Sequence, residues 1–321
     1  MKFMHNGFRW VDLIRTALLF VLTLMGVPGF SQLQPQQDWE SALYTDEPLV
    51  GKIWHSASKQ FVDVQDLANA IDSARYVLLG EKHDNPDHHS LQLKVLNHLI
   101  EQARVAAVAF EMMDSDDQEA LDQIPRHDLT NLENLKEHLK WDEDGWDWGF
   151  YGPLVLAVVL GDIPVAGANI TDATMSEVYG EDAVPEAIAI LDEETMQQLN
   201  LDIDESHCGL LPESQFPAMV RVQQARDYNM ANSMASPEAG KLSVLVAGNY
   251  HVRRDLGVPN YLLAREKTLK NEDILTLSFM EVEPGEADPV VYLQQFKSQL
   301  AFDYVWFTPA ISDADYCASL R

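Results

Sequence analysis

The sequence has little positive charge, and it lacks the short motifs of several large enzyme classes. Its 321 residues include 22 Lys and Arg against 51 Asp and Glu, which gives a formal net charge of −29 at pH 7. Phosphate backbones repel so acidic a chain, and we therefore expect no nucleic acid among its partners. The sequence contains no P-loop, no Gly-x-Gly-x-x-Gly and no Gly-x-Ser-x-Gly, which argues against nucleotide cofactors and serine hydrolases.

An apolar run long enough to span a membrane is also lacking, although the chain begins with a shorter one. Residues 1–31 hold three basic residues, an apolar run over 17–25, and then the small residues Gly29 and Ser31. This order predicts a secretory signal peptide, because a spanning helix needs ~18 apolar residues. An uncleaved membrane anchor is the alternative. Since no cysteine lies near the cleavage point, we expect a periplasmic or secreted protein that is not a lipoprotein.

Cysteine is scarce, with Cys208 and Cys317 the two present. In an exported protein an oxidising compartment allows two such thiols to pair. A bridge would tie the C-terminal segment to the rest of the chain and add at most a few kcal/mol of stability. Two unrelated buried thiols are the alternative, and we favour the disulfide.

The sequence does contain the material for a core, arranged as short apolar runs that alternate with helical patterns. Hydrophobic residues make up 46% of the chain, which excludes a disordered acidic tail. Apolar residues recur at helix spacing over 88–104, after the helix-start signal Asn85-Pro86-Asp87. Helices are also predicted at 153–160 and 218–234. Strands are predicted at 76–79, 105–110, 163–166, 242–247, 274–282 and 304–307.

Short buried strands that alternate with helices are typical of an α/β fold with a mostly parallel sheet flanked by helices. The segments at about 114–160 and 183–235 have few strand signals and predict a helical insertion or smaller subdomain. The predicted organisation is a signal peptide at 1–31, a lead-in at 32–60, an α/β domain at 61–285 and a C-terminal extension packed on the core at 286–321.

Polar side chains follow four of the predicted strands. Gly80-Glu81-Lys82-His83 and Gly248-Asn249-Tyr250-His251 share a Gly-x-x-His spacing, in which each glycine is expected to let the chain turn sharply off its strand. Glu111 and Asn169 follow two further strands. Because ligands bind beyond the carboxyl ends of parallel strands, we expect all four groups at one edge of the sheet.

Histidines and carboxylates together suit a first-row metal, and histidine also suits haem iron. The spacing matches no closed zinc site, and no His-Glu-x-x-His is present. The alternative for His88 and His89 is that they face solvent next to Asp87, which would cap the helix. For these two histidines the alternative is supported at least as well as a role in ligand binding.

Two other segments carry candidate binding residues. Arg226, on a predicted helix, has the fork geometry to bind a propionate or another carboxylate, with an ordinary helical salt bridge as the alternative. A dense aromatic segment suits a flat apolar ligand and equally suits a packed helix start. Its members are Trp141, Trp146, Trp148, Phe150 and Tyr151.

Taken together, the motifs resemble the ChaN-like family of haem-binding uptake proteins, within a wider group that includes Tiki- and TraB-like proteins and erythromycin esterases. The resemblance spans about residues 65–265. The motifs that carry it are Gly80–His89, Phe110–Met112, Trp148–Tyr151, Ala168-Asn169, His207–Gly209, Gln224–Asp227 and Gly248–Pro259. Members of the family are often lipoproteins, and this chain departs from them in lacking the lipid-bearing cysteine.

The resemblance implies haem binding outside the cytoplasm at the carboxyl edge of the sheet, in haem or iron acquisition. It also implies homodimers that enclose haem, and haem transport partners in the outer or inner membrane. Tyr151 is the first choice of iron ligand and Tyr250 the second. The remaining residues of the implied haem site are His83, His88, Asn169, Arg226 and His251.

The wider group also implies a rival function, a metal-dependent hydrolase. Glu81, His83, Glu111 and His251 would hold a divalent metal ion or activate water, and Arg253 would steady an oxyanion. Haem binding requires a tyrosine and an apolar slot, whereas metal-dependent hydrolysis requires Glu81 and fails with chelators. We favour the binding protein over the enzyme.

Overall fold

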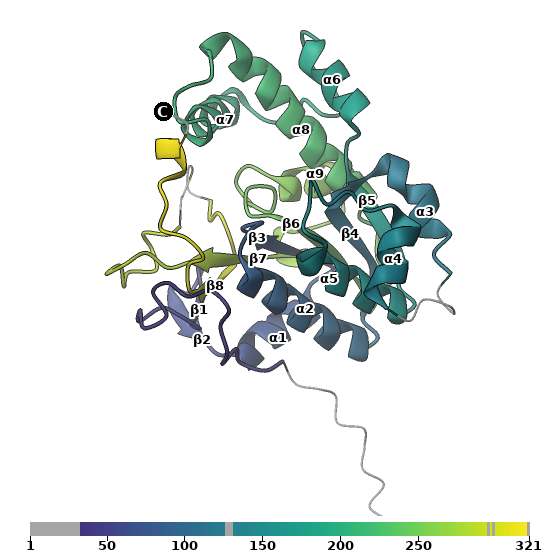
Figure 1. Ribbon diagram of the computed structural model, residues 1–321. Coiled ribbons are helices and arrows are strands. Elements are labelled where there is room, and N and C mark those ends of the chain that lie inside the picture. Colours follow the sequence, from purple (N-terminus) through teal and green to yellow (C-terminus); the bar gives the residue numbers. More distant parts are fainter. Residues whose placement is uncertain (1–32, 126–130, 294–295, 297–298, 320–321) are drawn as a thin grey trace, which may run out of the picture. The chain divides into compact units, whose positions relative to one another are not determined.

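The computed structural model describes residues 33–125, 131–293, 296 and 299–319 of the chain (Figure 1). The predicted signal peptide at 1–31 lies outside the described residues. Within the described ranges, no helix is both long enough and apolar enough to cross a membrane.

The described residues form an eight-stranded sheet with the order β2-β1-β8-β7-β3-β6-β4-β5. Neighbouring strands from β8 to β5 in this order are parallel, whereas β1 pairs antiparallel with β2 and β8. The prediction of a mostly parallel sheet is therefore confirmed. The strands are β1 (Ile53–His55), β2 (Gln60–Val62), β3 (Tyr76–Glu81), β4 (Val105–Asp114), β5 (Val165–Asn169), β6 (Leu242–Gly248), β7 (Ile274–Glu281) and β8 (Tyr304–Thr308).

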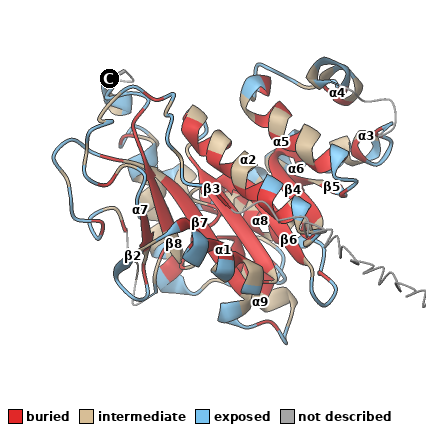
Figure 2. Ribbon diagram, turned by 90° about the horizontal axis from the view of Figure 1, so that it is seen from below, coloured by how far each residue is buried: buried red, intermediate tan, exposed pale blue. Residues whose placement is uncertain are grey.

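The central strands are nearly continuous apolar runs because helices cover both faces of the sheet, and Figure 2 shows them buried along their length. Alternate side chains enter opposite layers: Val77 and Leu79 pack with α1, α2 and α5, whereas Leu78 packs with α8 and α9. The helices are α1 (Val64–Ser73), α2 (Pro86–Glu101), α3 (Gln118–Asp122), α4 (Leu132–Leu139), α5 (Trp148–Leu160), α6 (Asp172–Gly180), α7 (Glu193–Ser206), α8 (Phe216–Ser233) and α9 (Val258–Arg265).

The predicted helix starts have clear local causes. Pro86 occupies the first turn of α2, and the Asn85 side chain accepts hydrogen bonds from the backbone N–H groups of Asp87 and His88. Helix α5 begins at Trp148 rather than at Pro153, because the Asp147 side chain caps it by accepting from the Gly149 N–H. Pro153 lies inside the helix, where it cannot donate a backbone hydrogen bond. The aromatic segment thus forms the beginning of this helix.

The segments outside the central strands are placed as follows. Helices α3 to α5 lie within 114–160, and α7 and α8 lie within 183–235. Strand β1 comes from the predicted lead-in, and strand β8 comes from the predicted C-terminal extension. These two strands pair with each other, so both ends of the described chain contribute to the same sheet.

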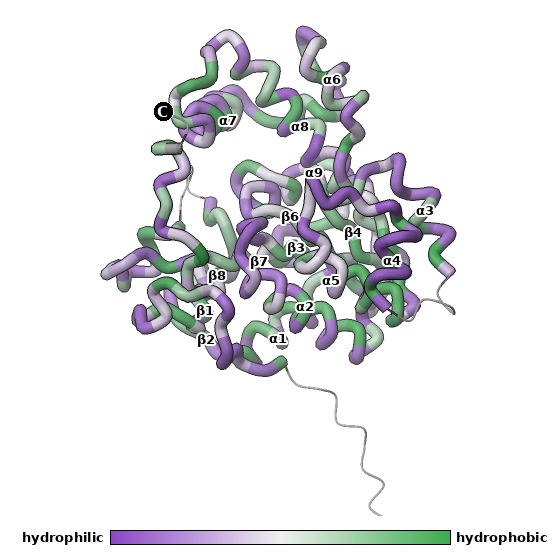
Figure 3. The backbone as a smooth tube through the Cα atoms, in the orientation of Figure 1, coloured by the Kyte–Doolittle hydropathy of each residue, from purple (hydrophilic) through white to green (hydrophobic). Residues whose placement is uncertain are grey.

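Helices α6 and α7 both pack against α8 (Figure 1). Helix α7 is largely hydrophilic, as Figure 3 shows, and it buries Thr195 and Leu199. Helix α6 has no buried residue. These two helices are therefore held by far less apolar burial than the helices that cover the sheet.

Cys208 and Cys317 form a disulfide, which confirms the predicted pairing. Cys208 lies directly beyond the C-terminal end of α7, and Cys317 lies in the C-terminal segment 109 residues further along the chain. The bond thus fastens this segment to the end of a lightly packed helix.

Candidate functional site

The carboxyl ends of β3, β4 and β6 bring six titratable side chains together, as the sequence predicts for the residues that follow these strands. We refer to this group as the inner cluster. It consists of Glu81, His83, Glu111, Tyr151, Asp227 and His251.

One half of the inner cluster is centred on Glu81. Its Oε1 lies 2.6 Å from His83 Nδ1 and accepts a hydrogen bond of 3.0 Å from the Tyr151 hydroxyl. Its Oε2 is buried and has no hydrogen-bond partner among the described residues. Burial opposes a charged His83, but the Glu81 carboxylate outweighs burial and raises the pKa of this imidazole. Burial and the same carboxylate raise the pKa of Tyr151, so its phenol stays protonated.

The other half is centred on His251. Its Nδ1 lies 2.6 Å from Asp227 Oδ1, and its Nε2 lies 3.3 Å from Glu111 Oε1. Burial disfavours a charged imidazole here, but the two carboxylates outweigh burial and raise the pKa of His251 to about 10. Burial likewise opposes a charged Glu111, yet His251 lowers the pKa of this carboxyl to about 2. His251 is therefore an imidazolium clamped between two carboxylates.

The two glycines of the Gly-x-x-His elements are required for space. Neither Gly80 nor Gly248 has a positive φ, so the expected sharp turn is wrong as the reason for them. A Cβ on Gly80 would lie 2.3 Å from Val252 Cγ2, and a Cβ on Gly248 would lie 3.0 Å from the His83 ring. The Gly248 N–H also donates to Glu111 Oε2 over 2.7 Å. Glycine thus lets the backbone approach the side chains of the cluster closely.

Aromatic rings cover the inner cluster. The Trp146 ring contacts the His83 ring edge-on at 4.9 Å and the Tyr151 ring at 5.8 Å. Trp148 and Tyr151 are both buried, so much of the aromatic segment packs the start of α5. No group of three or more His, Cys, Asp or Glu side chains among the described residues is arranged to hold a metal ion, so the predicted divalent-metal site is not supported.

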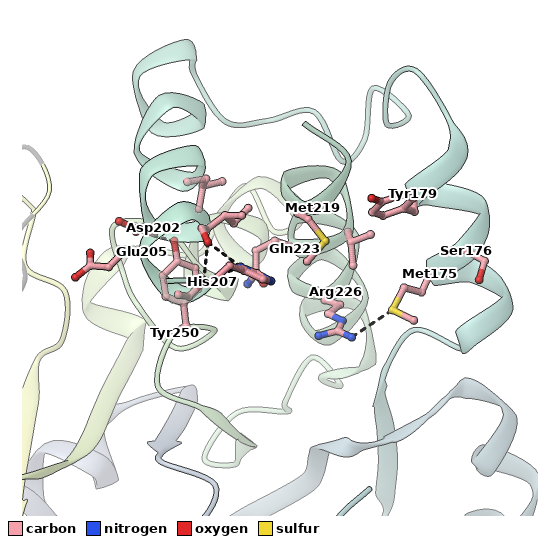
Figure 4. A pocket seen from close by; sticks show the side chains of 14 residues that line it. Met175, Ser176, Tyr179, Asp202, Glu205, His207, Met219, Gln223, Arg226 and Tyr250 are labelled. Carbon is pink, nitrogen blue, oxygen red and sulfur yellow. Dashed lines mark hydrogen bonds between the residues drawn. The ribbon is translucent and has the colours of Figure 1, made fainter. Parts of the chain in front are cut away.

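A separate cavity of about 900 Å³ lies between α6, α7 and α8, and we call it the α6–α8 cavity (Figure 4). Aliphatic side chains and methionines form much of its wall, with polar groups at particular points. Its lining residues are Met175, Ser176, Tyr179, Leu199, Asp202, Ile203, Glu205, Ser206, His207, Met219, Val222, Gln223, Arg226 and Tyr250.

Two potential iron ligands face this cavity from α7 and from the loop after β6. The Tyr250 hydroxyl donates a hydrogen bond of 2.7 Å to Asp202 Oδ2, and the Arg253 guanidinium lies 5.6 Å from the centre of the Tyr250 ring. Burial and Asp202 both raise the pKa of Tyr250. His207 Nδ1 lies 2.7 Å from the carbonyl oxygen of Ile203, which can only accept a hydrogen bond. Neutral His207 therefore carries its proton on Nδ1 and its lone pair on Nε2, the arrangement common among metal-binding histidines.

Arg226 provides a cationic group on the cavity wall. Its Nη2 lies 3.5 Å from Met175 Sδ, a weak acceptor. Its Nε is buried and has no partner in the part of the chain that the structure describes. The alternative role of Arg226, an ordinary helical salt bridge, is not formed among the described residues.

Gln223 joins the cavity to the inner cluster. It lines the cavity, and its Nε2 lies 3.1 Å from His251 Nδ1 and 3.3 Å from Asp227 Oδ2. The two sites therefore lie back to back, with one amide side chain between them.

The predicted haem-site residues fall into three places. Arg226 and Tyr250 line the cavity, whereas Tyr151, His83 and His251 belong to the inner cluster. His88 and Asn169 belong to neither group: the Asn169 side chain accepts from the Ile170 N–H, and His88 bonds to the Lys82 N–H and to Thr308.

The expectation that His88 and His89 face solvent is wrong, because both are buried. His89 stacks on Phe150 at 4.8 Å. Sequence reasoning did not single out the cavity residues Met175, Tyr179 and Met219 as site residues. The signal for His207 in the sequence is its place in the motif His207–Gly209.

The fold and these two sites define an α/β protein with a buried polar cluster and an adjoining apolar cavity. A family model described as "Haem-binding uptake, Tiki superfamily, ChaN" matches residues 67–262. The chain belongs to this family. No curated protein matches it.

Among solved structures, ChaN of Campylobacter jejuni, described as "Cofacial heme binding to ChaN of Campylobacter jejuni", shares the fold. It has a TM-score of 0.63 and 24% identity, over 79% of this chain and 95% of that chain. Two weaker matches are the type III effector HopBA1 (TM-score 0.40, 14% identity, 76% and 92% coverage) and an erythromycin esterase (TM-score 0.38, 13% identity, 68% and 72% coverage).

Proposed function

We propose that this protein is an exported haem-binding protein of haem or iron acquisition, and that haem occupies the α6–α8 cavity. The observation that carries the proposal is a largely apolar cavity with candidate iron ligands and an available arginine on its wall. Its volume of about 900 Å³ falls within the range of roughly 300–1,000 Å³ typical of ligand pockets. Membership of a family of haem-binding uptake proteins supports the same conclusion.

The cavity residues fit the chemistry of haem. The flat macrocycle is apolar and suits a slot walled by Leu199, Met219 and Val222. A propionate is a carboxylate, which the guanidinium of Arg226 on the cavity wall would bind in a charge-assisted hydrogen bond.

The iron ligand in this proposal is Tyr250, assisted by His207. Tyr151, the first choice from the sequence, belongs to the inner cluster and does not line the cavity. Ligation by a phenol oxygen requires loss of the hydroxyl proton, which Asp202 is placed to accept at 2.7 Å. Tyrosine and histidine are both established iron ligands in haem proteins.

A haemin titration of the chain from residue 32 onward tests this proposal, with absorption spectra at each step. We expect a saturable spectral change that Tyr250→Phe alters or abolishes. Tyr151→Phe is the matched control, because it removes the same hydroxyl from the inner cluster and should leave the haem spectrum as it is. A spectrum that changes with Tyr151→Phe and not with Tyr250→Phe would assign the ligand to the inner cluster instead.

Export and assembly are part of the same proposal. The disulfide and the family support a periplasmic or secreted protein, and the cofacial haem binding named for the Campylobacter jejuni relative supports homodimers that enclose haem. Leu201 within α7 and Leu210 beyond its end are 64% and 54% exposed and offer apolar surface for such contacts. Light scattering of the haemin-loaded protein should give twice the monomer mass. In this proposal the haem-loaded dimer exchanges haem with transport partners in the outer or inner membrane.

A second candidate function rests on the inner cluster. The buried Oε2 of Glu81 has no partner among the described residues, and His83 is close enough to relay a proton from it. These two groups would activate water for hydrolysis without a metal ion. Arg253 is bonded to Asp255 over 2.7 Å, which argues against its predicted oxyanion role. Turnover of chromogenic esters that survives chelators and is lost in Glu81→Gln, but not in the control Glu266→Gln, would establish this activity.

A further inference from the structure

We infer that the Cys208–Cys317 disulfide is a reducible clamp on the α6–α8 cavity, and that its reduction by a dithiol protein weakens haem binding. The inference rests on the proposed function, because it names a control of the same site. It follows from where the bond lies, from how lightly α7 is packed, and from how exposed the C-terminal segment is.

The disulfide lies next to the cavity wall. The C-terminal half of α7 supplies Asp202 and Ile203 to the lining, and His207 follows at its end. Cys208 is the next residue, so the covalent bond holds the backbone immediately beside a proposed iron ligand. A shift of this turn would displace both His207 and the Asp202 acceptor of Tyr250.

Among the described residues, helix α7 buries few side chains, although Met196 and Ile203 also pack on its small apolar cluster. It buries Thr195 and Leu199, and the small apolar cluster around Leu199 includes Val220 and Leu256. Leu201, which precedes Cys208 in the sequence, and Leu210, which follows it, are both exposed. Segments with few buried apolar contacts open at low free energy, so the end of α7 depends on its cross-link more than a core helix would.

The backbone at the bond is also unusual. Cys208 has φ 59° and Gly209 has φ 66°, both in the left-handed region that residues other than glycine rarely adopt. Backbone hydrogen bonds from Cys208 to Glu205 and from Gly209 to Asp204 support the turn. Once the cross-link is cut, Cys208 is free to relax toward the right-handed region, and the last turn of α7 would shift with it.

The other half of the bond is accessible to a reductant. Residues 311–316 are exposed and Cys317 is half-buried, so an attacking thiolate can approach from this side. In the exchange, a thiolate of the dithiol protein attacks one sulfur and the Cys208–Cys317 bond breaks. The reductant is then joined to Cys317 in a mixed disulfide, and Cys208 is released as a thiol. The second thiolate of the reductant attacks the reductant's own sulfur in this mixed disulfide and releases Cys317 as a thiol. The products are the free thiols of Cys208 and Cys317 and the oxidised dithiol protein, so two electrons and two protons pass from the dithiol protein to the disulfide.

The test compares the oxidised chain from residue 32 onward with its Cys208→Ser/Cys317→Ser variant. Haemin is titrated without added thiols, because thiols bind haem iron themselves. We expect at least tenfold weaker haemin binding in the variant. Ser312→Ala is the matched control, since it alters the exposed tail and keeps the disulfide, and its affinity should equal that of the parent.

Hydrogen exchange of the haem-free proteins provides the second readout. Residues 199–210 should exchange faster in the double variant, with the sheet strands unchanged. Equal affinity and equal exchange in the two proteins would overturn the inference. If neither protein binds haemin, the proposed function fails, and local exchange at 199–210 alone decides whether the clamp exists.

A folding defect in the double variant can be separated from loss of the clamp. The parent protein is folded first, then reduced, alkylated with iodoacetamide and freed of reductant. Faster exchange confined to 199–210 in this sample supports the clamp. Faster exchange across the sheet as well would overturn it, because the disulfide would then stabilise the whole fold rather than the cavity wall.

Discussion

The inner cluster and the α6–α8 cavity lie back to back, yet they are built in opposite ways. The cluster is formed at strand ends from buried charges with hydrogen bonds as short as 2.6 Å. Two of the three helices that wall the cavity, α6 and α7, bury few residues, and the polar groups of the cavity are spaced along a largely apolar surface. The comparison indicates that the inner cluster is rigid and that the cavity wall formed by α6 and α7 moves more easily. Changes in the cluster should therefore alter stability, and changes in the cavity should alter ligand binding.

The largest effect is expected from His251→Ala. It would leave the carboxylates of Glu111 and Asp227 facing each other without the cation between them. Removal of one partner of a buried ion pair costs about 3–5 kcal/mol. Urea unfolding should show this loss, while Ser176→Ala in the cavity wall should change stability by less than ~0.5 kcal/mol. Similar losses for both variants would contradict the contrast between the two regions.

The same ion pairs can be weakened by titration instead of mutation. The pKa of His251 is raised to about 10. Its contribution to the free energy of unfolding is therefore complete below pH ~6.5 and is lost as the pH rises through about 10. The pKa of Glu111 is lowered to about 2, so its contribution is present above ~4.5 and is lost as the pH falls toward 2. The free energy of unfolding should therefore fall on both sides, and His251→Gln should flatten the alkaline side. If the free energy of unfolding of His251→Gln still falls at alkaline pH as in the parent, the pH dependence belongs to another titratable group.

Gly80→Ala should cost about 1–3 kcal/mol, the usual range for overpacking. The added Cβ would lie 2.3 Å from Val252 Cγ2 and 2.6 Å from Asn249 Oδ1. Gly209→Ala is an informative comparison, because nothing lies within 4 Å of its Cβ but its φ is positive. Thermal unfolding measures both, and a neutral Gly80→Ala would show that the turn after β6 can move aside.

Arg226→Leu should have a small effect on stability and a clear one on binding. Loss of a hydrogen bond between charged groups costs about 1.5–3 kcal/mol, which corresponds to at least about tenfold weaker haemin binding. Arg226→Lys should recover part of the affinity through its charge. If Arg226→Leu binds haemin as tightly as the parent, the propionates lie elsewhere.

The inner cluster and the α6–α8 cavity also differ in how well the sequence predicted them. The strands were predictable, because apolar runs mark them. The meeting of Glu81, His83, Glu111 and His251 was also predictable, because parallel strands deliver the residues near their carboxyl ends to one edge. Asp227, on α8, was not predicted to join them. Residues of the cavity come from three helices whose relative placement is tertiary, and no linear spacing encodes it. Tyr151 was therefore preferred to Tyr250 as an iron ligand on motif grounds alone. The burial of His88 and His89 was missed for a related reason, since their partners Thr308 and Phe150 are distant in sequence.

The pairing of β1 with β8 has a consequence for how the chain reaches its final form. Ile53 to His55 pair across the sheet with Tyr304 to Trp306, about 250 residues further along the chain. During synthesis the N-terminal hairpin must wait for its neighbour until the last strand has been made, and non-local pairing of this kind slows folding. Until β8 has been made, β1 and β2 lack their neighbour in the sheet, so closure of the sheet must follow synthesis of most of the chain.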